Sequence, residues 1–247
     1  MKTILCALIV ICTPGLTKAQ FSSQGKITYE RKVNLKMKYQ TEEGYEWIKG
    51  RIDQVAPFKV SVFNMVFNKE QSNYTFEKDI EITKGSTFSW GKDPASENKI
   101  LSNYTTKKVL AEKEIFEDTY LVEDSLRKYT WKIEDEVRII AGYPCRKAVT
   151  KIYDSVVVVA FYSDQLMVSG GPESFNGLPG MILGLAIPRL FTTWFATNVD
   201  ILPQEPRKFT PIKKSKKVNN DQLVNIIKKG TDRWGQYGVK LLWKVSL

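Results

Sequence analysis

From Gly25 to about Asp200, apolar and polar residues alternate along the chain with a period of two. The segments 26–30 (KITYE) and 129–133 (YTWKI) show this pattern and are rich in Tyr, Thr and Ile. Successive side chains of an extended strand point to opposite faces of a sheet, so the alternation is typical of antiparallel strands with one face in water. The sequence therefore predicts a mainly β protein.

Turn-forming segments divide this region into candidate strands. The segments 134–136 (EDE) and 153–155 (YDS) are predicted turns because they are short and polar between apolar runs. The run 156–162 (VVVVAFY) is apolar throughout and is expected to be buried on both faces. The candidate strands include 58–67, 72–76, 99–104, 107–111, 115–122, 137–140, 146–152, 156–162, 181–187 and 191–199.

The composition changes after Leu202, where three prolines precede a lysine cluster. Prolines at this spacing predict an extended connection that leaves the sheet. A short helix is predicted next, with Asn220 as its N-cap and Gly230 as its C-cap, and the final segment 238–247 is interpreted as a closing strand. We therefore interpret residues 20–247 as a single β-rich domain with a basic C-terminal extension from about residue 203.

Residues 1–19 have the order of features found in a secretory signal peptide. Lys2 precedes an apolar run at 4–12, and Ala19 is a small residue before the expected cleavage site. The apolar run is shorter than the roughly 20 residues that span a bilayer, so a membrane anchor is disfavoured. Lipid attachment at Cys12 is an alternative, but it is disfavoured because Cys12 is not preceded by the small residue that such attachment usually requires. The sequence predicts a protein of the periplasm, or one secreted or associated with the outer membrane.

The chain is basic, with a formal net charge of +10. Loss of the signal peptide removes Lys2 and Lys18 and lowers this charge to +8. The expected partners of this charge are anionic lipid, acidic glycan or an acidic protein face, and nucleic acid is not expected for an exported chain. A solvated surface loop is the alternative interpretation of the basic cluster, which consists of Lys213, Lys214, Lys216 and Lys217.

Cys145 is the one cysteine left after signal cleavage, because Cys6 and Cys12 are removed. A single thiol forms no internal disulfide, so an oxidising compartment favours a buried, capped or intermolecularly paired cysteine. The apolar neighbours on its strand favour burial.

The segment 175–183 (FNGLPGMIL) is the most specific motif in the chain. Gly177 and Gly180 can adopt positive φ, and Pro179 restricts both itself and Leu178 before an apolar strand begins. The motif is interpreted as a structural corner, with Gly180→Val expected to cost more stability than Leu178→Ala. The alternative is a binding loop made of Phe175, Gly177, Leu178, Pro179 and Gly180.

Together with the segment 140–148 (IAGYPCRKA), this motif resembles the GLPGLI family of secreted Bacteroidota proteins, whose biochemical role is not established. The departures are Met181 in place of a leucine, Phe161 in place of a common tryptophan and Val168 in place of a usual proline. The matching residues are Ile140, Gly142, Tyr143, Cys145, Lys147, Ala148, Tyr162, Gly171, Pro172, Phe175 and the stretch from Gly177 to Leu183.

The resemblance implies work in the cell envelope. Members are often found near outer-membrane TonB-dependent receptors, and their long alternating strands look like the curled, incomplete antiparallel barrels of the LolA type. That likeness implies a curled antiparallel sheet or incomplete barrel, with a short C-terminal helix. The nearby receptors imply an outer-membrane receptor or secretion protein as the partner.

Three classes of function follow, none of which needs a cofactor or a metal. The preferred class is a non-catalytic accessory protein that docks onto outer-membrane machinery by a sheet edge or the basic tail. The second class binds a lipid, an acyl chain or a peptide on a concave sheet. The third is a hydrolase that uses carboxylates such as Asp164 and Glu173, because the chain has no histidine for a triad, a zinc site or imidazole catalysis.

Overall fold

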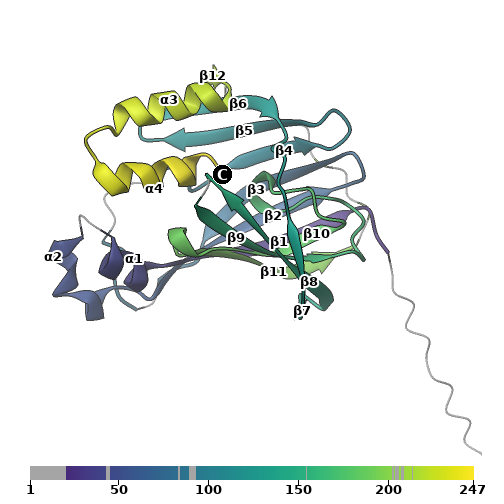
Figure 1. Cartoon of the computed structure of the whole chain (residues 1–247), viewed down its shortest axis with the longest axis horizontal. Coiled ribbons are helices and arrows are strands. Elements are labelled where there is room, and N and C mark those ends of the chain that lie inside the picture. The colour runs from purple at the N-terminus through teal and green to yellow at the C-terminus, as the bar shows by residue number, and fades with distance from the viewer. Residues whose placement is uncertain are drawn as a thin grey trace, which may run out of the picture.

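The protein folds into one large sheet flanked by helices, as seen in a computed structural model that describes residues 21–42, 45–82, 84–88, 93–153, 155–201, 203, 206, 209–212 and 214–247. The expected signal peptide lies outside the described residues. Figure 1 shows the arrangement. The strands are β1 (Gly25–Asn34), β2 (Phe58–Phe67), β3 (Gln71–Asp79), β4 (Lys99–Asn103), β5 (Lys108–Ile115), β6 (Asp118–Ser125), β7 (Lys132–Ile140), β8 (Tyr143–Ile152), β9 (Val156–Ser163), β10 (Met181–Ile187), β11 (Thr192–Asp200) and β12 (Lys216–Val218).

The helices lie mainly at one end of the sheet. Helices α1 and α2 follow β1 and form a separate small layer, and α3 and α4 lie beside β5 and β6 (Figure 1). None of the helices in the described part of the chain is long and apolar enough to cross a membrane. Their bounds are α1 (Leu35–Thr41), α2 (Glu46–Lys49), α3 (Asn220–Gly230) and α4 (Gly235–Val245), with short 3₁₀ turns at Ile52–Gln54 (η1), Pro172–Ser174 (η2) and Pro188–Leu190 (η3).

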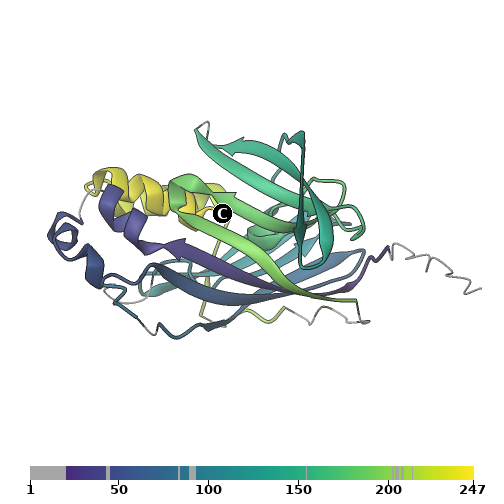
Figure 2. The ribbon, with the colours of Figure 1, turned by 90° about the horizontal axis from the view of Figure 1, so that it is seen from below.

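The sheet is open and has the strand order β12-β6-β5-β4-β3-β2-β1-β11-β10-β9-β8-β7. All neighbouring strands are antiparallel except β12, which runs parallel to β6. Figure 2 shows that the sheet curls strongly, so that the β8–β9 end rises above the layer that contains β1 and β2. The expected mainly β, curled antiparallel architecture is confirmed, and the sheet does not close into a barrel.

The main core lies on the inner face of this curl. On β1 the buried residues alternate, with Ile27 and Tyr29 fully buried, as the period-two pattern predicts. Leu185 on β10 and Trp194 on β11 face each other in the register and are also buried. A second, smaller cluster lies beneath α1 and α2 and consists of Leu35, Tyr39, Ile48, Val55 and Ala56.

The C-terminus differs most from the sequence-based expectation. The segment 238–247, predicted as a closing strand, lies largely in helix α4, so the protein has two C-terminal helices instead of one short helix. Residues Leu241, Trp243 and Val245 are buried, and Leu241 and Val245 are four residues apart. That spacing places both on one face of a helix, and burial of this face stabilises the helix over a strand.

Three further expectations are corrected. The predicted turn at 134–136 is a bulge within β7, where the register with β8 shifts between Ile133 and Val137. The chain after Leu202 returns to the sheet as β12 instead of leaving it. Both caps of α3 lie one residue outside the predicted ones. The N-cap is Asn219, whose side chain and that of Gln222 form a capping box, in place of Asn220, and the C-cap is Thr231 in place of Gly230.

Candidate functional site

The motif 175–183 forms the corner that leads into β10. A Cβ at Gly180 would lie 2.2 Å from the backbone oxygen of Ser163, a distance that real Cβ atoms do not reach. Gly177 has a φ of +93°, while a Cβ there would meet only the Trp131 ring at 3.5 Å. Gly180 is therefore required by close packing of two backbones, and Gly177 by its left-handed conformation.

The side chains of this corner are turned into the protein. Phe175 is fully buried, Leu178 is 2% exposed, and only Gly177 and Pro179 are at the surface. The Trp131 indole N–H donates to the backbone oxygen of Asn176 at 2.9 Å. The corner thus joins β10 to the segment before β7, and its apolar residues make internal contacts.

The basic cluster predicted at residues 213–217 has one ion pair among its described residues. Lys216 and Lys217 are both part of β12, and Lys216 forms an ion pair with Asp118 at 2.6 Å. Both side chains are exposed, as is that of Lys214 before the strand. Lys213 lies outside the described residues. The predicted basic cluster is therefore divided between an edge strand and the segment before it.

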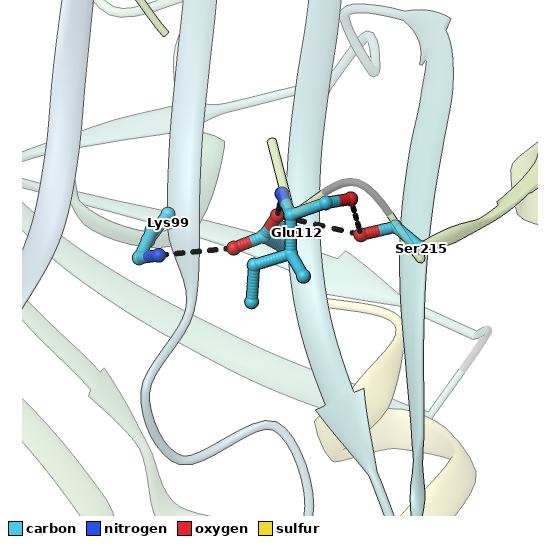
Figure 3. Close-up of polar contacts among 4 residues, drawn as sticks. Lys99, Glu112 and Ser215 are labelled. Atoms are coloured by element: carbon cyan, nitrogen blue, oxygen red, sulfur yellow. Dashed lines mark hydrogen bonds and ion pairs between the residues drawn. The ribbon is translucent and has the colours of Figure 1, made fainter. Parts of the chain in front are cut away.

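A buried carboxylate holds the segment that precedes β12. Glu112 on β5 is 4% exposed and accepts hydrogen bonds from the Ile212 backbone N–H at 2.6 Å and from the Ser215 hydroxyl at 3.5 Å. Its other oxygen pairs with Lys99 at 3.0 Å, and Figure 3 shows Lys99 and Ser215 on opposite sides of Glu112. This cluster has a structural explanation, because it holds Ile212 and Ser215 against the sheet.

The edge strand β7 exposes apolar side chains among charged ones. Its exposed apolar residues are Ile133, Val137 and Ile139, and its charged residues are Lys132, Glu134, Asp135, Glu136 and Arg138. It is 9 residues long, and among the described residues only β8 pairs with it. Val137 is 56% exposed and Ile139 is 71% exposed, and the two residues point to the same face. Exposed apolar side chains on an unpaired edge are a recognised site for the addition of a strand from another chain.

A groove continues from the start of this edge. It has a volume of about 780 Å³ and is bordered by residues 127–134 and 149–153. Tyr129 and Tyr153 supply aromatic surface, and Glu134 is the one acidic side chain that lines it. Its basic side chains are Arg127, Lys128, Lys132 and Lys151. We call β7 together with this groove the β7 docking surface.

A cavity of about 60 Å³ lies on the other side of the protein, between β1, β11 and α4. Arg31, Asp93, Glu173 and Lys244 are among the charged residues that line it. Burial alone raises the pKa of the Asp93 carboxyl, but the ammonium groups of Lys244 and Lys38 hold that pKa well below its usual range. Asp93 therefore carries a negative charge inside the cavity.

The two carboxylates considered for hydrolysis lie in different environments. Glu173 is 1% exposed and lines the cavity, whereas Asp164 is exposed in the turn after β9 and does not line it. In the described part of the chain no group of three or more His, Cys, Asp or Glu side chains is placed to hold a metal ion. The described residues form an exposed strand edge at β7 and a cavity lined by charged side chains.

Fold and surfaces together define a mainly β protein with a curled open sheet and an exposed edge. Residues 150–184 match the model of a family described as "Protein of unknown function (Porph_ging)". The match includes the 175–183 motif, so it supports a resemblance to a family of the Bacteroidota type, although it does not carry the GLPGLI name. No curated protein matches the chain.

The chain is also similar to solved structures of PNGF-II. For the C2 crystal form the TM-score is 0.51 at 16% identity, with 90% of this chain and 33% of that chain covered. For the P21 form the TM-score is 0.49 at 19% identity, with 80% and 32% covered. The chain thus spans about a third of the PNGF-II chain, and the first of these similarities supports the fold alone.

Sequence reasoning did not find the β7 docking surface or the cavity. The alternation at 129–133 pointed to a strand there, but nothing in that pattern told an edge strand from a central one. The cavity is built by residues from β1, α1, β11 and α4 that are distant in sequence. The sequence did contain one signal for the cavity. Arg31 has the same parity as Ile27 and Tyr29 in an alternating strand, so a charged side chain was to be expected on the buried face.

Proposed function

We propose that this chain is a non-catalytic, exported protein of the cell envelope that docks onto an outer-membrane receptor or secretion protein through the β7 docking surface. The observation that carries the proposal is the exposure of Val137 and Ile139 on an unpaired edge strand. A partner segment in extended conformation adds a strand to β7 and covers both side chains.

Charge indicates the chemistry of that segment. The groove that continues from β7 has four basic side chains and one acidic one along its walls. An extended segment complements the surface when its acidic residues lie in the groove and its apolar residues cover Val137 and Ile139 on β7, which itself carries the acidic run 134–136. Attraction between opposite charges in the groove speeds its association. Binding is therefore expected to weaken as the salt concentration rises.

Binding of an acyl chain on the concave side is less well supported. The aromatic residues Phe63, Phe67 and Tyr74 of β2 and β3 are buried in the core and so do not line a hollow. Trp194 does line the cavity, but that cavity has a volume of only about 60 Å³. A drug-sized ligand needs roughly 300 Å³ or more, so the space suits a small polar group better than a lipid tail.

The proposal is tested with envelope extract and three proteins. The wild type is compared with a Val137→Lys/Ile139→Lys double variant, because lysines on an edge strand oppose strand addition. Met167→Lys is the matched control, since Met167 is also 56% exposed but lies in a loop away from β7. We expect identified outer-membrane receptor or secretion proteins to be retained by the wild type and the control and lost from the double variant. Equal retention by all three would contradict docking at β7.

A further inference from the structure

The cavity between β1, β11 and α4 has a pattern of charges that its own residues do not complete. Two of its cations have partners, because Lys240 pairs with Glu42 at 3.1 Å and Lys244 pairs with Asp93. These two pairs connect α4 to α1 and to the loop before β4. Lys38 is a third cation of the cavity: burial lowers the pKa of its ammonium group, but the charges of Asp93 and Glu42 outweigh burial and raise that pKa. One further cation of the cavity has no ion pair with a carboxylate among the described residues.

That cation is Arg31 on β1. Its side chain is 4% exposed, and its guanidinium lies 5.0 Å from the centre of the Phe63 ring. Its Nη2 donates to the Ser61 hydroxyl at 3.4 Å, and Nε has no hydrogen-bond partner among the described residues. Ser61 in turn donates to Asp79 at 2.6 Å, but Asp79 forms its ion pair with Lys59.

A buried guanidinium without a carboxylate is costly for a protein. Burial removes the charge from water, and a ring and a hydroxyl replace only part of that hydration. The guanidinium has five N–H donors in a planar fork, which matches the two oxygens of a carboxylate. Arg31 is therefore placed to bind an external carboxylate inside the cavity.

A hydrogen-bond acceptor without a donor lies in the same cavity, at Asn98 beside Glu173. The Asn98 amide donates to Glu173 at 2.8 Å, which leaves the Asn98 carbonyl oxygen buried and without a donor in the described part of the chain. Glu173 is held with a φ of +50°, a left-handed conformation that is strained for a residue with a side chain. A ligand N–H or O–H would satisfy this carbonyl oxygen.

We propose that the cavity binds a small carboxylate that carries a hydrogen-bond donor, of the amino-acid or hydroxy-acid type. The carboxylate pairs with Arg31, and the donor reaches the Asn98 carbonyl or the Glu173 carboxylate. The cavity volume of about 60 Å³ fits a group of this size. One water molecule needs roughly 10 to 15 Å³ of such space, so the cavity has room for several non-hydrogen atoms.

Three small probes separate the two halves of this proposal in the wild-type protein. Glycine has both a carboxylate and an ammonium group, acetate has the carboxylate alone and methylamine has the ammonium group alone. Trp194 lines the cavity, so its indole N–H signal in a ¹⁵N spectrum, assigned with a Trp194→Phe variant, reports on occupancy. We expect a saturable shift with glycine, a weaker one with acetate and none with methylamine. The absence of a saturable shift with either carboxylate, or an equal shift with methylamine, would overturn the proposal.

A pair of variants tests the role of Arg31. Arg31→Gln is expected to weaken glycine binding by about tenfold or more, the loss typical of a charged hydrogen bond. Arg189→Gln is the control, because Arg189 also lies over an aromatic ring, at 5.6 Å from the centre of Trp243, but does not line the cavity. Wild-type affinity in a folded Arg31→Gln protein would contradict the proposal. If that variant does not fold, the three probes on the wild type still decide.

Discussion

The carboxylate of Glu112 accepts a hydrogen bond from the backbone N–H of Ile212 at 2.6 Å and joins residues that are 100 positions apart. The contact fixes the segment before β12 against β5, so that β12 can pair with β6. An exposed, basic C-terminal segment thus becomes part of the sheet edge because one buried acid holds it.

Glu112→Leu should release this segment. Loss of a hydrogen bond to a charged group costs about 1.5 to 3 kcal/mol. We expect faster cleavage by trypsin after Lys214 and Lys217, measured by mass spectrometry, with a smaller effect on global unfolding in urea. Glu123→Leu is the control, since Glu123 lies exposed on the neighbouring strand β6. Equal cleavage of both variants would show that Glu112 does not anchor the segment.

Two glycine variants distinguish backbone strain, at Gly142 in the turn between β7 and β8, from backbone collision, at Gly180 in the 175–183 corner. Gly142→Ala meets no atom within 4 Å but has a φ of +85°, so it should cost only the strain, about 1 to 2 kcal/mol. Gly180→Ala adds a methyl group 2.2 Å from the Ser163 backbone oxygen and should cost more, about 4 kcal/mol or above. Urea unfolding of both proteins measures the difference, and equal costs would refute the explanation of Gly180.

Leu178→Ala provides the comparison within the corner. Leu178 is 2% exposed, so truncation should cost about 2 to 5 kcal/mol. This is a larger effect than a surface binding loop would show. An unchanged melting temperature together with loss of a partner would instead favour the binding-loop alternative.

Cys145 should be unreactive in the folded protein. It is fully buried, its thiol donates to the Tyr143 carbonyl at 3.4 Å, and burial raises its pKa to about 12. Thiolate is the reactive form, so alkylation by iodoacetamide at pH 8 should be slow in buffer and fast in urea. Rapid labelling of the native protein would contradict this view.

Cys145→Ser should lower the free energy of unfolding by about 1 to 3 kcal/mol because it buries a hydroxyl.

Acid should weaken the contact between α4 and the loop before β4. The pKa of Asp93 is lower in the folded protein than in the unfolded chain, chiefly because Lys244 and Lys38 outweigh the effect of burial. Below its usual pKa the unfolded chain binds a proton that the folded protein does not, so stability falls with pH. In melts from pH 6 to pH 3, wild type should be more stable than Asp93→Asn at pH 6, and the difference should shrink below about pH 4. A constant difference would show that the carboxylate charge is not responsible.

Local patterns predicted much of the sheet. The strands β2 and β10 have the bounds expected from their sequences, and β9 extends one residue beyond its expected end. Cys145 is buried, as its apolar neighbours indicated. Gly177 and Gly180 lie in a turn before an apolar strand, as their spacing with Pro179 predicted. These features depend on backbone conformation and on alternation along a few residues, which a sequence displays directly.

The bulge in β7, the helix α4 and the return of β12 to the sheet were decided by contacts between distant segments. The apolar residues of 238–247 suit a helix or a strand, and only the position of Leu241 and Val245 against the sheet selects the helix. The cavity also depends on contacts between distant segments, because Arg31, Asn98 and Glu173 come to it from separate parts of the chain. The sequence by itself determined most of the strands from β1 to β11, because side-chain alternation and turn chemistry are local. The tertiary structure alone decided which strand is left as an edge and which charges share a cavity, because those depend on the order of the strands in the sheet.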